Sequence, residues 1–145
     1  MTTSVTLTKL RRISTPKGDV LHCLKSTDSG FVGFGEAYFS MVLPNDTKGW
    51  KRHNRMTLNL AVVVGAVRFL VRDSSPPHAQ ILDVVLSPDE EALYQRLTVP
   101  PGYWVAFRGV SSRESMLVNI ASIPHDPTEA DTVALSTFSV SDEKQ

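Results

Sequence analysis

The sequence predicts an all-β domain folded as a closed or nearly closed barrel. Short β-prone runs separated by turn residues extend along the 145-residue chain, a pattern typical of sandwiches and barrels. No stretch of ten or more residues carries the 3.6-residue apolar period of an amphipathic helix, which excludes α/β layering. The length fits a single domain, 1–145, and closing roughly ten strands into a barrel removes exposed sheet edges.

The N-terminal part contains three predicted strands. Residues 5–10 alternate weakly, and a Thr-Pro-Lys-Gly-Asp turn separates them from the apolar run 20–24. Residues 35–42 follow another turn and alternate clearly between polar and apolar side chains. A Pro-Asn-Asp-Thr sequence that starts at Pro44 ends this third strand.

The middle of the chain holds two long apolar runs, 56–64 and 67–71. The Gly65-Ala66 pair between them predicts a hairpin turn, because glycine suits its first central position. A strand over 81–86 follows, and residues 87–93 predict a single helical turn with a serine cap and an early proline.

The last predicted strands are 97–99, 103–110 and 116–122. We expect the folded core to span about residues 5–131 and the polar tail, 138–145, to be flexible.

Composition excludes several classes of protein. The 15 basic and 15 acidic residues balance to zero net charge, which argues against a nucleic-acid binder because such proteins need a basic surplus. The only cysteine, Cys23, cannot form an intramolecular disulfide and is expected to be a buried small side chain, with a reactive thiol as the alternative. No signal peptide or membrane-length apolar run is present, so a cytoplasmic location is expected.

The most informative segment is 48–60, where a dense cluster of basic residues precedes a hydrophobic strand. If the segment is extended, alternate side chains share a face, because side chains alternate with period two. That face comprises Lys51, His53, Arg55, Thr57 and Asn59. It predicts an anionic-ligand site in which His53 transfers protons. The alternative is a solvated loop, 48–55, that leads into a half-exposed strand.

Several motifs in this order resemble those of cupin proteins. Residues 48–53, followed by Gly65, resemble the first cupin motif, and residues 100–104, Pro-Pro-Gly-Tyr-Trp, resemble the second. The chain is similar to the nucleotide-sugar branch of cupins, the dTDP-4-dehydrorhamnose 3,5-epimerase-like proteins and the dTDP-4-keto-6-deoxyhexose 3,4-ketoisomerases. Further matching segments are 33–36, 56–62 and 121–129. The resemblance covers residues 33–131 and implies a jelly-roll β-barrel with its chemistry inside.

The resemblance implies an isomerase that moves a proton next to a ketone, with no metal and no cofactor. At the positions that bind metal in other cupins, this chain has Lys51, His53, Thr57 or Leu58, and Val105. Only one of these side chains is an imidazole, and a single such ligand does not make a metal site. We therefore predict no bound metal.

The catalytic candidates are His53, Lys51 and His125. The catalytic histidine of the epimerases aligns with Lys51, and their tyrosine acid aligns near His125. An imidazole titrates near neutral pH, which makes His53 a candidate base, and a desolvated lysine is a second one. The epimerase histidine contacts a carboxylate from later in the chain, and we expect this chain to end too soon to supply it in the same way.

The candidate substrate-binding residues lie on several predicted strands. Each has an outward-facing or core role as its alternative. They are Glu36, Tyr38, Arg55, Thr57, Asn59, Arg68 and Trp104.

The resemblance leaves two functions open and implies one partner. The first function is an epimerase or ketoisomerase acting on a dTDP-type 4-keto-6-deoxysugar. The second is a degenerate cupin that binds a sugar nucleotide or another small anion without turnover. The family forms homodimers, and residues 5–10 are expected to pack on the partner's sheet. No nucleic acid or membrane is an expected partner.

Overall fold

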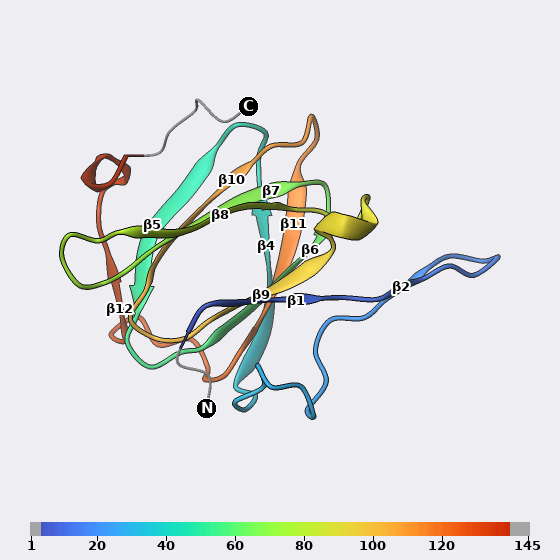
Figure 1. Ribbon diagram of the computed structural model, residues 1–145, viewed down its shortest axis with the longest axis horizontal. Helices are drawn as coiled ribbons and strands as arrows, with labels where there is room; N and C mark the ends of the chain where they lie inside the picture. The colour runs from blue at the N-terminus through green and yellow to red at the C-terminus, as the bar shows by residue number, and fades with distance from the viewer. Residues whose placement is uncertain (1–3, 140–145) are drawn as a thin grey trace.

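Two five-stranded antiparallel sheets face each other and enclose the interior of the protein. The structure, a computed structural model, describes residues 4–139 (Figure 1). Within them lie twelve strands and two short 3₁₀ helices. The elements are β1 (Thr6–Lys9), β2 (Arg12–Ile13), β3 (Val20–Leu21), β4 (Glu36–Val42), β5 (Thr47–His53), β6 (Leu58–Val64), β7 (Val67–Arg72), β8 (Gln80–Leu86), η1 (Glu91–Leu93), β9 (Gln95–Val99), β10 (Trp104–Gly109), β11 (Ser115–Ala121), β12 (Ala130–Thr132) and η2 (Leu135–Thr137). The predicted all-β class is confirmed.

The first sheet has the strand order β1-β9-β6-β11-β4, and the second has the order β12-β5-β10-β7-β8. Strands β2 and β3 form a separate hairpin that projects from the body, at the right of Figure 1. Strand β1 pairs with β9, Thr6 opposite Thr98, and forms one edge of the first sheet. No helix in residues 4–139 is long and apolar enough to cross a membrane.

The predicted hairpin at Gly65 was wrong. Strands β6 and β7 belong to opposite sheets, so Gly65 and Ala66 turn the chain from one layer to the other. Gly65 has a φ of 81°, and a Cβ there would lie 2.3 Å from the Ser115 hydroxyl, so the corner requires glycine. Both strands are buried apolar runs, and placing them in facing sheets lets each contribute to the core.

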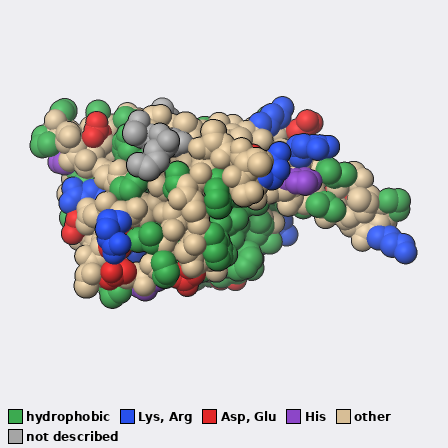
Figure 2. Space-filling model, turned by 90° about the horizontal axis from the view of Figure 1, so that it is seen from below, with side chains coloured by type: hydrophobic (Ala, Val, Ile, Leu, Met, Phe, Trp, Pro, Cys, Tyr) green, Lys and Arg blue, Asp and Glu red, His purple; other side chains and the backbone are tan. Residues whose placement is uncertain are grey.

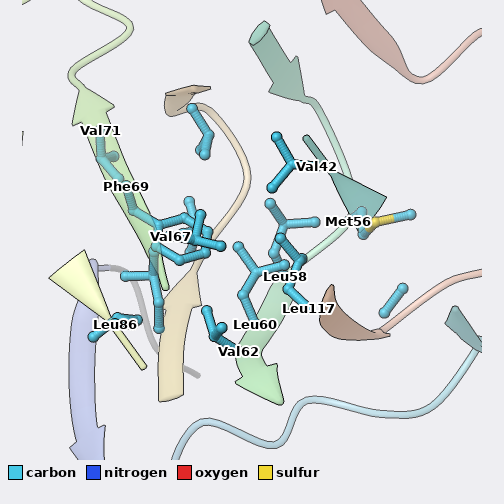
Figure 3. Close-up of a cluster of buried hydrophobic side chains, with 14 residues drawn as sticks. Val42, Met56, Leu58, Leu60, Val62, Val67, Phe69, Val71, Leu86 and Leu117 are labelled. Atoms are coloured by element: carbon cyan, nitrogen blue, oxygen red, sulfur yellow. The ribbon is translucent and has the colours of Figure 1, made fainter. Parts of the chain in front are cut away.

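The core fills the space between the sheets. Figure 3 shows Val67 and Phe69 of β7 pointing toward Leu58, Leu60 and the neighbouring apolar side chains of the other sheet. The alternate side chains of each strand therefore face inward, as period two dictates. The outer faces carry two smaller clusters, one around Tyr94 and Ala61 and one around Trp50 and Trp104.

Two predicted elements differ from those observed. The helical turn is a 3₁₀ helix, η1, that starts only at Glu91, because the Ser87 hydroxyl donates to the Gly65 carbonyl at 2.7 Å and accepts from the Asp89 N–H. Residues 47–53 form the strand β5 rather than a solvated loop. Of the tail that the sequence predicts to be flexible, 138–145, Phe138 packs on the outer face of the second sheet, and 140–145 lie outside the described residues.

Candidate active site

A cavity of about 240 Å³ opens between the sheets and is lined by both of them. Its apolar wall comes from inward-facing side chains of β6, β10 and β11, including Leu58, Val105 and Leu117. Its polar lining comes mainly from β4 and β5. The polar residues are Tyr38, Ser40, Lys48, Lys51, His53 and Asn119. Few convergent polar groups on an apolar wall are typical of a small-molecule site.

A β-bulge in β5 places three basic residues on the cavity side. Val105 of β10 pairs with Lys51, but Phe107, two residues on, pairs with Lys48, so β5 carries one extra residue between these pairs. Without the bulge, Lys48 and Lys51 would face opposite sides of the sheet, since they are three positions apart in the sequence. Gly49 allows it: its φ is 135°, and a Cβ there would lie 2.7 Å from that of Ala106.

His53 ends β5 and forms a buried pair with Glu129. Its ring nitrogen Nδ1 is hydrogen-bonded to Glu129 Oε1, and the two residues are only 8% and 4% exposed. The strand β12 that follows Glu129 lies beside β5, with Ala130 opposite His53. Because Nδ1 contacts the carboxylate, Nε2 is the ring nitrogen left for the cavity that His53 lines.

Glu129 is held as a carboxylate by its surroundings. Its Oε2 accepts the backbone N–H groups of Asn54, Arg55 and Met56 at 3.2, 2.9 and 3.3 Å. Burial alone would raise the pKa of Glu129, but the His53 ring and these backbone donors hold it below its usual range. An ionised carboxylate accepts the Nδ1 proton of His53 and so fixes which ring nitrogen can act as a base.

Lys51 projects into the same cavity two residues before His53. The two Cα atoms are about 6.6 Å apart along an extended strand. Among residues 4–139 the Lys51 ammonium has neither a hydrogen bond nor an ion pair. The ammonium of Lys48, in contrast, donates to the Met41 carbonyl. Lys51 is therefore the cationic group of the cavity that is ready to meet an anionic oxygen.

The opposite polar wall is a cross-strand pair between β4 and β11. Asn119 faces Tyr38 in the register, and its Nδ2 donates to the Tyr38 hydroxyl at 2.9 Å. The Oδ1 of Asn119 accepts the Asn59 N–H at 3.0 Å, which fixes the orientation of the amide. The Tyr38 hydroxyl therefore keeps its own proton to donate to a group in the cavity.

The predicted stripe continues only from Lys51 to His53. Strand β5 ends at His53, and the turn before β6 breaks the period-two alternation. Arg55 is exposed and bonds Asp126 at 3.1 Å, while Thr57 is buried beside Ser122. Leu58 and Leu60 of β6 line the cavity, so the Asn59 side chain between them points to the opposite face of the sheet. The prediction that these three side chains share the cavity face was wrong.

His125 and Glu36 lie outside the cavity lining. His125 is exposed in the loop before β12, and its backbone N–H donates to Glu36 Oε1 at 2.8 Å. The predicted convergence of His125 with Lys51 and His53 was therefore wrong. A loop that turns back toward the surface before Glu129 keeps the His125 side chain in water.

Arg68 and Trp104 face the outside of the second sheet. Arg68 alternates with the core residue Phe69 and forms a two-pronged ion pair with Asp83, at 2.8 and 2.9 Å. Trp104 is buried on the same outer face, with the Arg52 guanidinium 4.9 Å from its ring centre. Its neighbour Val105 is the residue that lines the cavity. Both were predicted as substrate-binding residues, and neither lines the cavity.

Sequence reasoning missed three residues of this site: Glu129, Asn119 and Lys48. Glu129 is 76 residues from His53, and no local pattern links the two. A signal existed, because the segment 121–129 matched the family and ends in this acidic residue. The chain was expected to end too soon to supply a late carboxylate in the same way as the epimerases, yet Glu129 supplies one to His53.

Neither a metal-binding group nor an activated thiol occurs in the part of the chain that the structure describes. In residues 4–139 no three His, Cys, Asp or Glu side chains are grouped so as to hold a metal ion. Cys23 is half-buried against the Tyr94 cluster, and burial raises the pKa of its thiol. The alternative of a reactive cysteine is therefore disfavoured.

Comparison with known proteins shows which solved structures share this fold. No protein-family model matches the chain, and no curated protein sequence matches it. Among solved structures, a dTDP sugar isomerase from Desulfovibrio desulfuricans G20 is 34% identical, with a TM-score of 0.83, over 91% of this chain and 85% of that one. Two others share the fold at lower identity. The sugar 3,4-ketoisomerase QdtA from Thermoanaerobacterium thermosaccharolyticum is 20% identical (TM-score 0.73; 90% and 89% covered). A dTDP-4-dehydrorhamnose 3,5-epimerase from Sulfolobus tokodaii is 16% identical (TM-score 0.77; 94% and 80% covered).

These matches agree with the site geometry. The barrel, the inward-facing histidine motif on β5 and the closing segment that ends in Glu129 occur together in one chain. The predicted cupin fold is confirmed, and the likeness supports an isomerase-type enzyme. With 34% identity over most of both chains, the protein belongs to the cupin family of sugar-nucleotide isomerases and epimerases.

Proposed function

We propose that the protein is an epimerase or ketoisomerase acting on a nucleotide-linked, dTDP-type 4-keto-6-deoxysugar by metal-independent proton transfer. The observation that carries this proposal is the His53–Glu129 pair beside the unpartnered Lys51, in one cavity. A base and a cation side by side are what deprotonation next to a ketone requires. The solved dTDP sugar isomerase and QdtA, which was crystallised with TDP, support the substrate class.

In the first step, Nε2 of His53 takes the proton from the carbon next to the C4 ketone. The C–H electron pair forms a carbon–carbon double bond, and the C=O pair moves onto oxygen to give an enolate. Lys51 donates to that oxygen, and Glu129 stabilises the imidazolium that forms. The low exposure of His53 and Glu129 strengthens both interactions, because little water screens them.

The second step decides between the two reactions. In a ketoisomerase the proton of the C3 hydroxyl passes to the enolate oxygen on C4, and the C4 carbon receives a proton from His53, so C4 becomes a hydroxyl-bearing carbon and the ketone moves to C3. In an epimerase the same carbon is reprotonated from the opposite face. The Tyr38 hydroxyl, on the wall formed by β4, is the candidate donor for that face. His125 is not, because it lies outside the cavity lining.

The size of the cavity limits what it encloses. Ligand sites for drug-sized molecules are typically about 300–1,000 Å³, and this one is about 240 Å³. The cavity therefore accommodates the sugar, and we place the nucleoside diphosphate at its mouth. The single cysteine is compatible with a cytoplasmic location, which we also propose.

The proposal predicts exchange of substrate hydrogen with solvent. Incubated in deuterium oxide with a dTDP-4-keto-6-deoxyhexose, the protein is expected to introduce deuterium at C3 or C5 if it is an epimerase and at C4 if it moves the ketone, because the proton on His53 exchanges before it is returned. Proton NMR and mass spectrometry of the sugar measure the label, and the carbon shifts of the product distinguish a moved ketone from an inverted centre.

Two controls make this experiment decisive. The same incubation without protein gives the background exchange of the ketosugar. Calorimetric titration with dTDP measures binding independently of turnover. If the protein binds dTDP but gives no exchange above background, even at high protein concentration, the enzyme hypothesis is rejected in favour of a degenerate cupin that binds without turnover.

We also propose that the protein forms a homodimer through the outer face of the first sheet. Strand β4 is an edge strand, and large hydrophobic side chains on it and beside it are exposed, Phe39 to 64%. The others are Phe34, Met41 and Leu43. Figure 2 shows hydrophobic side chains gathered on the body beside the projecting hairpin. An exposed apolar edge of this kind is typical of an interface.

Light scattering is expected to give the mass of a dimer for the natural chain and of a monomer for Phe39→Glu, because a charge desolvated at an interface is costly. Ile81→Glu is the matched control, since Ile81 is 45% exposed on the edge strand of the other sheet. A monomeric natural chain at micromolar concentration, or equal effects of both variants, would contradict this interface.

A further inference from the structure

The segment that carries Glu129 continues as a strap along the edge of the second sheet. We call residues 129–139 the C-terminal strap. Its strand β12 pairs with β5, and Val133 then exchanges two backbone hydrogen bonds with Trp50, at 3.1 and 3.3 Å. Figure 1 shows β12 beside β5, with the short helix η2 beyond it. The strap therefore runs along the edge of the sheet, beside the strand that carries His53.

The strap ends in an aromatic anchor, Phe138. Its ring lies 5.2 Å from that of Trp50, edge to face, 5.2 Å from that of His78 and 5.9 Å from that of Trp104. The Arg72 guanidinium lies 5.6 Å from the ring centre of Phe138. Contacts of this number on one side chain fix its position, and aromatic pairs of this geometry add to the area that they bury.

Two arginines tie the same segment to the sheet. Arg52 donates to Asp131 Oδ2 at 2.7 Å, and Arg72 donates to the Ser139 carbonyl at 3.3 Å. Both arginines project from the outer face, and each also lies over an aromatic ring of that face. The strap is thus attached at its start, its middle and its end.

The loop before the strap gives Glu129 much weaker support. Pro124, His125, Pro127 and Thr128 are all exposed. The ion pair between Asp126 and Arg55 is also at the surface, and exposed pairs contribute little to stability. Beyond the hydrogen bonds of Glu129 itself to His53 and to the backbone of residues 54–56, the packing that supports it therefore comes from the residues that follow it.

We propose that Phe138 is a positioning residue, and that its docking between Trp50 and Trp104 holds Glu129 against His53. The catalytic importance of this arrangement rests on the proposed function; the geometric coupling does not. Trp50 lies on β5 between Lys48 and His53, so the anchor binds the same strand that presents the base. Undocking Phe138 frees the strap, withdraws Glu129 and leaves the His53 ring free to turn and to change its protonated nitrogen.

The test compares Phe138→Ala with the natural chain by two measurements. In protein labelled with ¹⁵N-histidine, long-range ¹H–¹⁵N spectra show which ring nitrogen of His53 is protonated, and His53→Gln assigns the signals. We expect a fixed Nδ1–H form in the natural chain and averaged ring signals in Phe138→Ala. We also expect kcat to fall by about tenfold to a hundredfold with nearly unchanged KM, because a small misplacement of a catalytic group has this effect.

Leu135→Ala is the matched control, since Leu135 belongs to the same strap but is 38% exposed on η2 and lies outside the aromatic cluster. It is expected to behave as the natural chain. Phe138→Leu keeps most of the buried volume and loses the ring contacts, so it decides the question if Phe138→Ala does not fold. A folded Phe138 variant with the natural His53 spectrum would overturn the proposal.

The two measurements separate the two proposals. If the natural chain turns over no sugar nucleotide, the proposed function fails, yet the His53 spectra still show whether Phe138 positions Glu129. If turnover is normal in a folded Phe138→Ala protein with natural His53 spectra, only the positioning role fails.

Discussion

Glutamine in place of His53 is expected to lower kcat by about 10²–10⁴-fold, the usual contribution of a general base. Glutamine keeps a polar side chain of similar reach, so the Glu129 carboxylate keeps a hydrogen-bond partner in the buried site. What is lost is the ring nitrogen that takes the substrate proton. Deuterium incorporation into the sugar and steady-state turnover measure the loss, and calorimetry with dTDP is expected to show nearly unchanged binding.

His22→Gln is the matched control, because His22 is exposed and lies outside the cavity lining. It is expected to keep the natural rate. A His53→Gln protein that binds dTDP and retains its deuterium exchange would remove His53 from the role of base. Lys51 would then be the remaining candidate on the same strand, and its variants would decide.

The sequence predicted the part of the site that lies on one strand. Lys51 and His53 share a face because side chains alternate with period two, and the structure places both in the cavity. The same rule failed beyond His53, because a strand must continue for its alternation to hold. Here β5 ends at His53. Arg55 and Thr57 lie in the turn that follows, and Asn59 lies on the next strand, β6.

The missed residues belong to contacts that no local pattern encodes. Glu129 meets His53 only after the chain has completed both sheets, and Asn119 meets Tyr38 through the pairing of β11 with β4. Lys48 enters the cavity through a bulge, and the only sign of the bulge in the sequence is Gly49. Each depends on a partner that is distant in the sequence.

The aromatic and charged residues of the second sheet were harder to place than the apolar ones. A strand between two apolar layers shows no simple alternation, and both faces of β10 are buried, the inner one at Val105 and the outer one at Trp104. A tryptophan after a turn therefore did not reveal which layer it joins. Trp104 joins the outer layer of the second sheet, because Phe138 and Val133 of the C-terminal strap pack against its cluster there.

Replacing Lys51 with methionine is the second change with a large expected effect. Methionine keeps the unbranched stem and removes the ammonium, so the apolar contacts of the side chain survive. If Lys51 stabilises the enolate oxygen, kcat falls by about 10²–10³-fold, as for the loss of one oxyanion donor, and dTDP binding changes little. Turnover, deuterium exchange and calorimetry on the same preparation measure both quantities.

The opposite pattern would assign Lys51 to binding alone. A large rise in KM and a loss of dTDP affinity, with kcat unchanged at saturation, would mean that the ammonium contacts substrate and transition state equally. Lys51→His sharpens the distinction, because it replaces the ammonium by an imidazole. An oxyanion donor should tolerate this change better than methionine, since an imidazole still donates. If Lys51 acts on the enolate, the order of kcat is therefore lysine, then histidine, then methionine, and equal rates for histidine and methionine would contradict that role.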